Sequence, residues 1–179
     1  HIEWDTETGF WLNRKNVKLR GVSEHYEGGP VGGAWTKPLL KWKLSLLKEM
    51  GVNAVRVGHN PYPPMFYELC DELGLMVMDE IFDGWIQKAE HDYGAHHFDE
   101  WWKKDVEEWV TRNRNHPSII IYSVGNETHG DIASDLVKEV KKHDPTRLVT
   151  SGSADTDAME VAGVNGGSET QQFLETQRY

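Results

Sequence analysis

The chain has 179 residues, of which 38% are hydrophobic and 11% aromatic, a composition typical of one globular domain with its own core. Its formal net charge of −10 argues against nucleic acid or an anionic membrane as a partner, because both bind basic surfaces. The single cysteine, Cys70, excludes an internal disulfide and a zinc site built from several cysteines. The sequence begins with His1 rather than Met, so we expect a processed or excised piece of a longer protein.

Residues 1–16 are interpreted as a segment that precedes the main domain. They alternate apolar and polar side chains like a short hairpin, with the turn at 13–16. The main domain is expected to start at Val17 with a first strand that runs to His25. A loop rich in glycine and proline follows at 27–33.

From there on, stretches of strand type alternate with amphipathic stretches of helix type. Further strands are predicted at 54–58, 75–78, 118–127 and 148–151, with a short candidate sixth strand at 161–164. Helices are predicted at 39–50, 64–73, 98–114, 132–143 and 171–177, and a long loop at 81–97. Cys70 falls in the apolar pattern of the second helix, where we expect a small buried side chain. One side of the helix at 98–114 is expected to pack against the sheet, through Phe98, Trp101, Trp102, Val106, Trp109 and Val110.

Strict strand–helix alternation predicts an α/β fold with a parallel sheet. No Gly-x-Gly-x-x-Gly motif and no P-loop follows any strand, which argues against a nucleotide-binding doubly wound sheet. Polar residues instead gather after the strands, as in a TIM barrel, where the carboxyl ends of the strands form the catalytic face. A (β/α)8 TIM barrel needs eight units and about 250 residues, so we predict a barrel truncated after about six βα units.

The most apolar strand, at 118–127, ends in Asn126 and Glu127, which makes Glu127 the first candidate for chemistry. The polar residues expected at the same mouth are Glu24 and His25, His59 and Asn60, Asp79 and Glu80, and Ser151 to Ser153. Carboxylates beside amides and indoles suit the hydrolysis of sugars, in which one carboxyl protonates the leaving oxygen. Asn126, His25 and His59 could hydrogen-bond sugar hydroxyls, and Trp85 could offer a platform for a pyranose face.

Each of these residues also has a structural interpretation. Glu127 could be a salt-bridge partner, and the two histidines could cap helices. Arg56 lies inside an apolar strand, where a buried arginine must be paired, so Asp79 or Glu80 is expected beside it. The histidines at positions 91, 96 and 97 do not have the spacing of a standard metal site.

Three segments together resemble the catalytic barrel of glycoside hydrolase family 2, which holds β-galactosidases, β-glucuronidases and β-mannosidases. They are residues 53–61 (NAVRVGHNP), 66–80 (FYELCDELGLMVMDE) and 112–127 (RNRNHPSIIIYSVGNE). The resemblance extends from about Gly9 to Gly166. It implies that residues 1–16 are the junction from a β-sandwich domain and that residues 17–179 are part of a catalytic TIM barrel.

The resemblance also implies roles for single residues in a retaining double displacement. Glu127 matches the general acid/base, and Asn126 matches the residue that holds the substrate 2-hydroxyl. His25 and His59 match sugar-contacting histidines, and Arg56 matches the arginine of the strand-two motif. The family's nucleophile is a second glutamate after strand seven, which we expect beyond residue 179, because Glu169 and Glu175 fall after the predicted sixth strand.

Magnesium-using β-galactosidases of that family carry Ile-Glu-x-His after the acidic pair, whereas residues 81–85 here are IFDGW. We therefore expect no metal and no cofactor, and Asp83 and Trp85 become candidate substrate contacts. The predicted function is a retaining β-glycosidase, β-galactosidase-like because the charge of −10 disfavours an anionic glucuronide. Its substrate would be an oligo- or polysaccharide, and the chain alone is expected to be inactive.

Two other functions stay open from the sequence. The chain could be a non-catalytic carbohydrate-binding or assembly module, since an incomplete barrel leaves sheet edges that can pair into a homo-oligomer. It could also be part of another barrel glycosidase, such as a β-glucanase.

Overall fold

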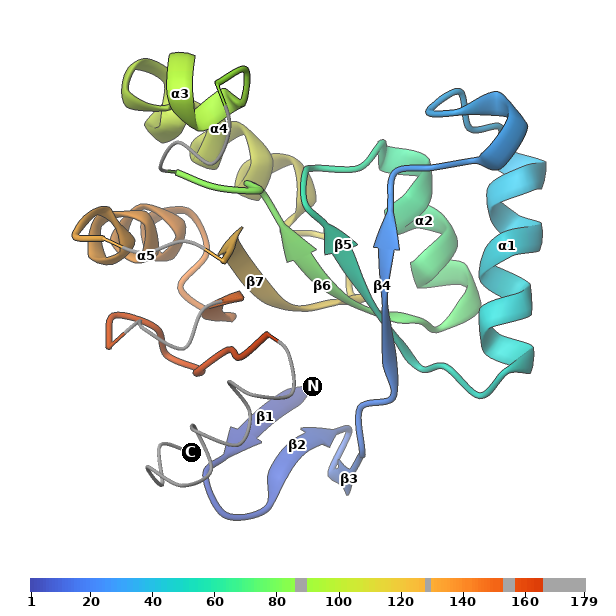
Figure 1. The fold of residues 1–179 in the computed structure, drawn as a ribbon. Coiled ribbons are helices and arrows are strands. Elements are labelled where there is room, and N and C mark those ends of the chain that lie inside the picture. The colour runs from blue at the N-terminus through green and yellow to red at the C-terminus, as the bar shows by residue number, and fades with distance from the viewer. Residues whose placement is uncertain (86–89, 128–129, 153–156, 166–179) are drawn as a thin grey trace.

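The computed structural model describes residues 1–85, 90–127, 130–152 and 157–165. Five parallel strands form the main sheet, in the order in which they occur along the chain. They are β4 (Gly21–His25), β5 (Ala54–Gly58), β6 (Met76–Glu80), β7 (Ile119–Asn126) and β8 (Leu148–Gly152). The carboxyl ends of β4, β5 and β6 point toward the same edge (Figure 1). The predicted parallel α/β sheet of a partial TIM barrel is therefore confirmed.

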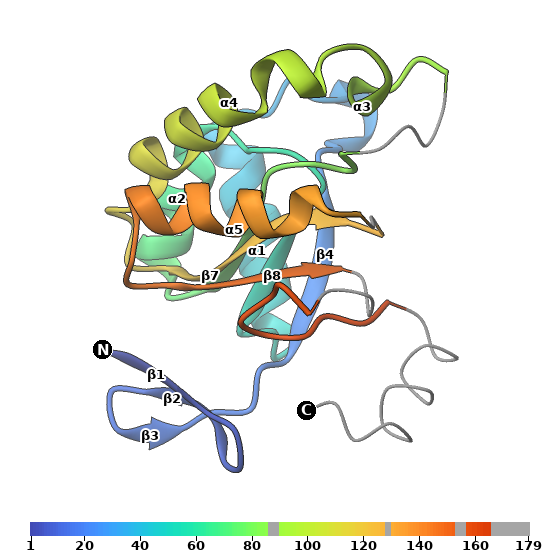
Figure 2. The same ribbon diagram turned by 90° about the vertical axis from the view of Figure 1, so that its left-hand side faces the viewer.

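The helices connect successive strands and pack on the outside of the sheet (Figures 1 and 2). They are α1 (Lys37–Glu49), α2 (Pro64–Leu73), α3 (Tyr93–His96), α4 (Phe98–Asn113) and α5 (Ile132–His143), with a 3₁₀ turn, η1 (Gly29–Val31), after β4. Capping residues define two of the helix ends. The Thr36 side chain accepts a hydrogen bond from the Leu39 N–H at the start of α1, and Gly74 ends α2 in the left-handed conformation, with φ 68°. Cys70 is buried in α2, as predicted, and burial raises the pKa of its thiol.

Two predictions about apolar positions differ from the structure. Trp101 is 41% exposed, whereas Trp102 and Trp109 are 8% and 3% exposed, so Trp101 lies outside the face of α4 that packs on the sheet. The segment 161–164 is not a strand; it runs along β8, where the Val149 carbonyl accepts the N–H groups of Glu160 and Val161. The helix expected at 171–177 and Ser153 lie outside the described residues.

The N-terminal segment forms a small antiparallel sheet of three strands, β1 (Ile2–Asp5), β2 (Gly9–Leu12) and β3 (Lys15–Asn16). The predicted hairpin is the pair β2–β3, and its turn is shorter than expected: Asn13 and Arg14, with φ 50° and 67°, make a two-residue connection. The first strand of the main sheet correspondingly starts at Gly21 rather than Val17. Phe10 packs with Met76, Ile120 and Ile121, which attaches the small sheet to the amino ends of the parallel strands (Figure 1).

No helix in the parts of the chain that the structure describes has the length and apolar composition needed to cross a membrane.

Candidate active site

β7 delivers Asn126 and Glu127 to the carboxyl edge of the sheet. All eight residues of this strand are buried, and Glu127, the residue after it, is exposed. Glu127 has a φ of 46°, in the left-handed region that residues with a Cβ adopt at a cost of roughly 1 kcal/mol. Such a strained conformation persists only where surrounding contacts hold it, and residues of this kind cluster at functional sites. The strand thus ends with a carboxylate turned out of the core.

Below Glu127, a buried carboxylate organises the side chains of three strands. Glu80, at the end of β6, has no exposed surface. Its Oε2 accepts from Arg56 Nε at 3.1 Å and Nη2 at 3.0 Å and from Ser123 Oγ at 2.6 Å, and its Oε1 lies 2.5 Å from His59 Nδ1. Arg56 is therefore paired, as its place in an apolar strand predicts, and Glu80 is its partner.

Asp79, the other candidate partner, points to the opposite face of β6, because successive side chains of a strand alternate. There it accepts hydrogen bonds from Tyr67 Oη at 2.6 Å and from Asn113 Nδ2 at 2.8 Å. Burial raises the pKa of Asp79 to about 6, although these two donors act in the other direction. Asp79 thus binds α2 and α4 to the sheet and takes no part in the mouth.

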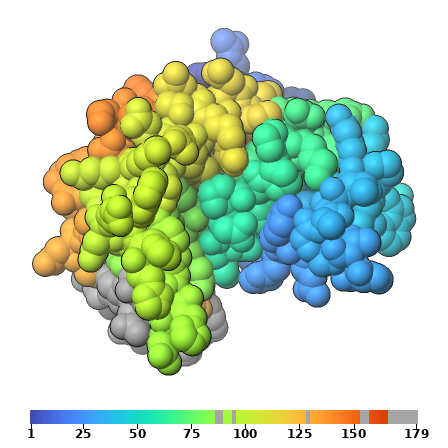
Figure 3. Space-filling view, turned by 90° about the horizontal axis from the view of Figure 1, so that it is seen from above, coloured from blue at the N-terminus to red at the C-terminus, as the bar shows by residue number. Residues whose placement is uncertain are grey.

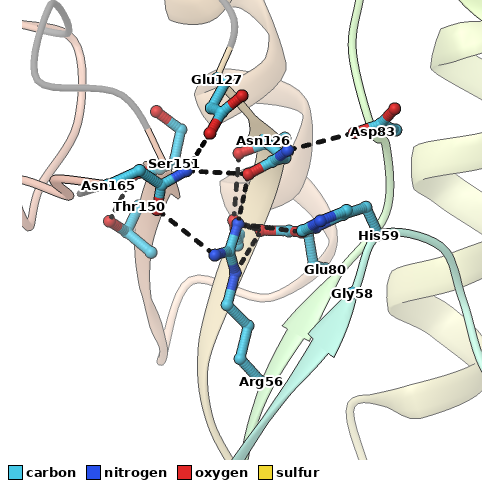
Figure 4. A network of polar contacts seen from close by, with 12 residues as sticks. Arg56, Gly58, His59, Glu80, Asp83, Asn126, Glu127, Thr150, Ser151 and Asn165 are labelled. Carbon is cyan, nitrogen blue, oxygen red and sulfur yellow. Dashed lines mark hydrogen bonds and ion pairs between the residues drawn. The ribbon is translucent and has the colours of Figure 1, made fainter. Parts of the chain in front are cut away.

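Asn126 connects the buried pair to the rest of the mouth (Figure 4). Its Oδ1 accepts from Arg56 Nη2 at 2.8 Å and from Asn165 Nδ2 at 2.9 Å. Its Nδ2 donates to Asp83 Oδ1 at 3.1 Å. Asn165 also donates to Glu127 Oε1 at 3.4 Å. The structure therefore brings together Arg56, Asn126 and Glu127 with Asp83, which the sequence analysis had singled out separately.

The two predicted histidines lie beside this network. Their rings meet edge to face, with centroids 5.1 Å apart, and the Gly58–His59 peptide bond is cis. His59 is held by Glu80 through Nδ1, which leaves Nε2 as the ring atom for another partner. His25 is exposed and reaches the network through its contact with His59.

Trp85 does not present the expected sugar platform. It is 3% exposed and belongs to the main hydrophobic cluster, together with Ile81 and Phe82 of the same loop. The loop after β6 turns back into the core at these residues, so the indole has no exposed face on which a pyranose could stack. Asp83, between them, remains exposed and in contact with Asn126.

Asn165 and Ser123 are site residues that the sequence analysis missed. Ser123 interrupts an apolar strand and could have been noticed as a buried hydroxyl that needs a partner. Asn165 follows a stretch without apolar periodicity, and no pattern in the sequence marks it. Its place depends on how residues 157–165 lie against β8.

A cavity of about 580 Å³ opens next to the network. The loops after β5 and β6 line it with His59 and Asp83, and α4 lines it with Asp105, Glu108 and Trp109. Figure 3 looks down on this face of the molecule, with α3 and α4 in yellow-green on one side and α1 and α2 in blue and teal on the other. The cavity borders the network at His59 and Asp83 and extends toward α4, and neither Asn126 nor Glu127 lines it.

Within the described ranges, no group of three or more histidine, cysteine, aspartate or glutamate side chains is arranged to hold a metal ion. His96, one of the three loop histidines, instead hydrogen-bonds the Glu90 carbonyl at 2.6 Å. The expectation that the protein uses no metal stays a prediction.

Comparison with known proteins identifies the family. Residues 5–172 match the TIM barrel domain of the glycosyl hydrolases family 2. The chain belongs to this family. It is 63% identical, over 99% of its length, to a protein of Formosa agariphila named putative beta-glucuronidase, and 44% identical, over 69% of its length, to the beta-galactosidase BoGH2A of Bacteroides ovatus.

Solved structures of glycosidases agree with this family assignment. A beta-glycosidase from Bacteroides vulgatus is 44% identical and superposes with a TM-score of 0.92 over 98% of the chain. A family 2 glycosyl hydrolase from Bacteroides cellulosilyticus is 36% identical, with a TM-score of 0.90 over 98% of the chain. The chain spans 17% and 14% of the two sequence relatives, and 24% and 25% of the two chains of known structure.

Proposed function

We propose that this chain is the part of a family 2 retaining β-glycosidase that supplies the general acid/base, Glu127. The observation that carries the proposal is the position of this carboxylate. It is exposed at the carboxyl end of a fully buried strand, next to an amide that Arg56 and Asp83 hold in place. In barrel enzymes this end of the strands forms the catalytic face.

The chemistry assigned to Glu127 has two steps. Its carboxyl O–H first gives its proton to the glycosidic oxygen while the bond from that oxygen to the anomeric carbon breaks. Its carboxylate then takes a proton from water, whose oxygen bonds to the anomeric carbon and displaces the enzyme's nucleophilic carboxylate. Asn126 contributes its remaining N–H to a hydroxyl of the sugar.

The nucleophile is proposed to come from a strand outside this chain. Glu80 is a poor candidate, because it has no exposed surface and accepts hydrogen bonds from Arg56, Ser123 and His59. A carboxylate surrounded in this way is stabilised in place and is shielded from a substrate carbon. Asp83 is already an acceptor for Asn126.

A neutral β-galactoside is the favoured substrate. Arg56, the guanidinium of the network, is already paired with Glu80, and Asp83 is a further acidic side chain at the mouth. A uronate would have to approach the carboxylate of Asp83, which Coulomb repulsion disfavours. A β-glucuronide is the second candidate, because the 63% identical relative is named putative beta-glucuronidase.

The test replaces the matching segment of the Formosa agariphila relative with this chain. Aryl β-galactosides and β-glucuronides are then assayed with the graft, with its E127Q variant and with the chain alone. We expect E127Q to reduce kcat/KM by roughly 10²- to 10⁴-fold on substrates with poor leaving groups, because they need the proton most. The matched control is E107Q, an exposed glutamate of α4 outside the mouth, which should leave the rate unchanged.

Full activity of E127Q would overturn the acid/base assignment. Turnover by the chain alone at ordinary glycosidase rates would overturn the proposal that the nucleophile lies elsewhere. A third outcome would instead support a non-catalytic binding module. In that case sugar changes the tryptophan fluorescence of the chain alone, and the graft hydrolyses none of the substrates.

A further inference from the structure

Asn165 touches three of the side chains that build the mouth. Its Nδ2 donates to Asn126 Oδ1 at 2.9 Å and to Glu127 Oε1 at 3.4 Å, and its Oδ1 accepts from Arg56 Nη1 at 3.4 Å (Figure 4). Both ends of one amide are thus engaged by residues from β5 and from the end of β7. Hydrogen bonds of this kind are often long in the absence of substrate and shorten when it binds.

The segment that carries Asn165 is held against β8 by specific bonds. The Val149 carbonyl accepts from Glu160 N–H at 3.0 Å and Val161 N–H at 3.2 Å, and Thr150 Oγ1 donates to the Val161 carbonyl at 2.7 Å. The Val149 N–H donates to the Glu160 carboxylate at 3.0 Å. These contacts hold Glu160 and Val161 against β8 independently of Asn165 itself.

Two glycines allow the close approach that the network needs. A Cβ at Gly163 would lie 1.7 Å from the Ser151 carbonyl oxygen, closer than any side chain can come. A Cβ at Gly152 would lie 2.8 Å from Arg56 Nη2 and 3.0 Å from Asn165 Nδ2. The chain therefore leaves out side chains at the two points where they would separate Asn165 from its partners.

Asn165 completes the hydrogen bonding of the Asn126 amide oxygen. An amide oxygen has two lone pairs, and Asn126 Oδ1 receives one donor from Arg56 and one from Asn165. One hydrogen of Asn126 Nδ2 goes to Asp83. If the amide were reversed, its NH₂ group would face two donors, so these contacts fix its orientation. Asn126 is left with a single N–H for a substrate hydroxyl.

Asn165 also constrains the carboxyl group of Glu127. Because Asn165 Nδ2 donates to Oε1, that oxygen already acts as an acceptor, which favours Oε2 as the oxygen that carries the proton in the acid form of Glu127. The proton is thereby presented by the oxygen that does not face Asn165.

We infer that Asn165 is a positioning residue, which fixes the amide of Asn126 and makes Oε2 of Glu127 the oxygen that hands the proton to the leaving group. This inference rests on the proposed function. In the step it orients, the Oε2–H bond breaks, the proton goes to the glycosidic oxygen, and that oxygen keeps the electron pair of its bond to the anomeric carbon. The nucleophilic carboxylate of the retaining mechanism takes its place on that carbon.

The test uses the graft described above, with aryl glycosides of the same sugar that differ in leaving group. N165A is expected to lower kcat/KM by roughly 10²-fold on substrates with a poor leaving group, and by much less on a 2,4-dinitrophenyl glycoside. In the E127Q background, N165A should add no further dependence on the leaving group, because Asn165 acts there through Glu127. N115A, an exposed asparagine before the other end of β7, is the matched control and should behave as the unmodified graft.

The outcomes separate this inference from the proposed function. If E127Q is fully active, the proposed function fails. If E127Q is impaired but N165A loses nothing, or loses equally on all leaving groups, the inference fails, because equal loss is what a merely structural role produces. N165S, which keeps a donor, should recover part of the loss.

A second measurement needs no variant and decides the case if N165A does not fold. A neutron structure of the unmodified protein should show the two deuterons of Asn165 Nδ2 directed at Asn126 Oδ1 and Glu127 Oε1. A reversed amide at Asn165 or Asn126 would overturn the inference.

Discussion

Glu80 is a charged side chain with no exposed surface, and its contacts explain why the protein tolerates it. Arg56 neutralises its charge, with 19% of the arginine side chain exposed, and Ser123 and His59 engage the remaining lone pairs. A buried ion pair adds little stability by itself, but removing one partner leaves an uncompensated charge. The pair therefore serves chiefly to hold Arg56 where it can contact Asn126.

E80Q is expected to destabilise the chain strongly. The amide that replaces the carboxylate leaves Arg56 without a counter-charge, and its NH₂ group faces N–H or O–H groups that donated to the carboxylate. The free energy of unfolding should therefore fall by about 3 kcal/mol. Urea denaturation of the chain measures it. E72Q on α2 is the matched control: its ion pair with Lys41 is exposed, and no measurable change is expected. Equal effects of the two variants would contradict the argument.

At the scale of elements, β6 shows how one strand serves two purposes. Its last two residues are both buried carboxylates, and alternation sends Glu80 to the mouth and Asp79 to the helices. Tyr67 of α2 and Asn113 of α4 both donate to Asp79, so one side chain ties two helices to the strand. Its pKa of about 6 shows that burial outweighs these bonds.

The raised pKa of Asp79 predicts how stability depends on pH. The folded state binds the proton more tightly than the unfolded state, whose pKa is near 3.8. The resulting stability is fully present below pH 3.8 and is lost as the pH rises through 6. The difference of about two pH units corresponds to roughly 3 kcal/mol.

Comparison with D79N, which cannot titrate, isolates this contribution from other groups. Between pH 4 and 7, the free energy of unfolding of the unmodified chain should fall relative to that of D79N in urea titrations. D99N, an exposed aspartate at the start of α4, is the control and should follow the unmodified chain. Parallel pH profiles for the unmodified chain and D79N would show that Asp79 is not the titrating group.

At the scale of the whole molecule, the described part of the sheet ends at β4 on one side and β8 on the other. The two edges differ. Residues 157–165 run along β8 and occupy both the N–H and the carbonyl of Val149. β4 pairs with β5 alone within the described ranges, so its other edge has no strand partner there. An available edge is a template for pairing with another chain.

The chain alone is therefore expected to self-associate through β4 rather than β8. Light scattering should show a mass that grows with concentration. Hydrogen exchange at high and low concentration then locates the contact: protection should increase in Gly21–His25 and not in Leu148–Gly152, which serves as the internal control. A monomer at high concentration, or protection of β8 alone, would contradict this prediction.

Much of the fold could be predicted because its signals are local. The ends of β5 and α5 lie where the sequence analysis placed them, since each is bounded by residues that stop an apolar pattern. The segment 161–164 misled the prediction, because a short apolar run looks like a strand whether or not its backbone completes a ladder. Trp101 was expected on the packed face of its helix because the apolar stripe of an amphipathic helix is broad, and a residue at its margin can be exposed.

The sequence alone determined the alternation of strands and helices, and it placed Glu127 and Asn126 at the end of the most apolar strand. Both are properties of short stretches, because burial on two faces requires a continuous apolar run wherever the strand lies in the sheet. Tertiary structure alone decided that Glu80 rather than Asp79 pairs with Arg56, that Trp85 is buried, and that Asn165 reaches Glu127. These contacts join residues far apart in the chain, so they depend on strand register and on the path of the connecting segments, which no local pattern specifies.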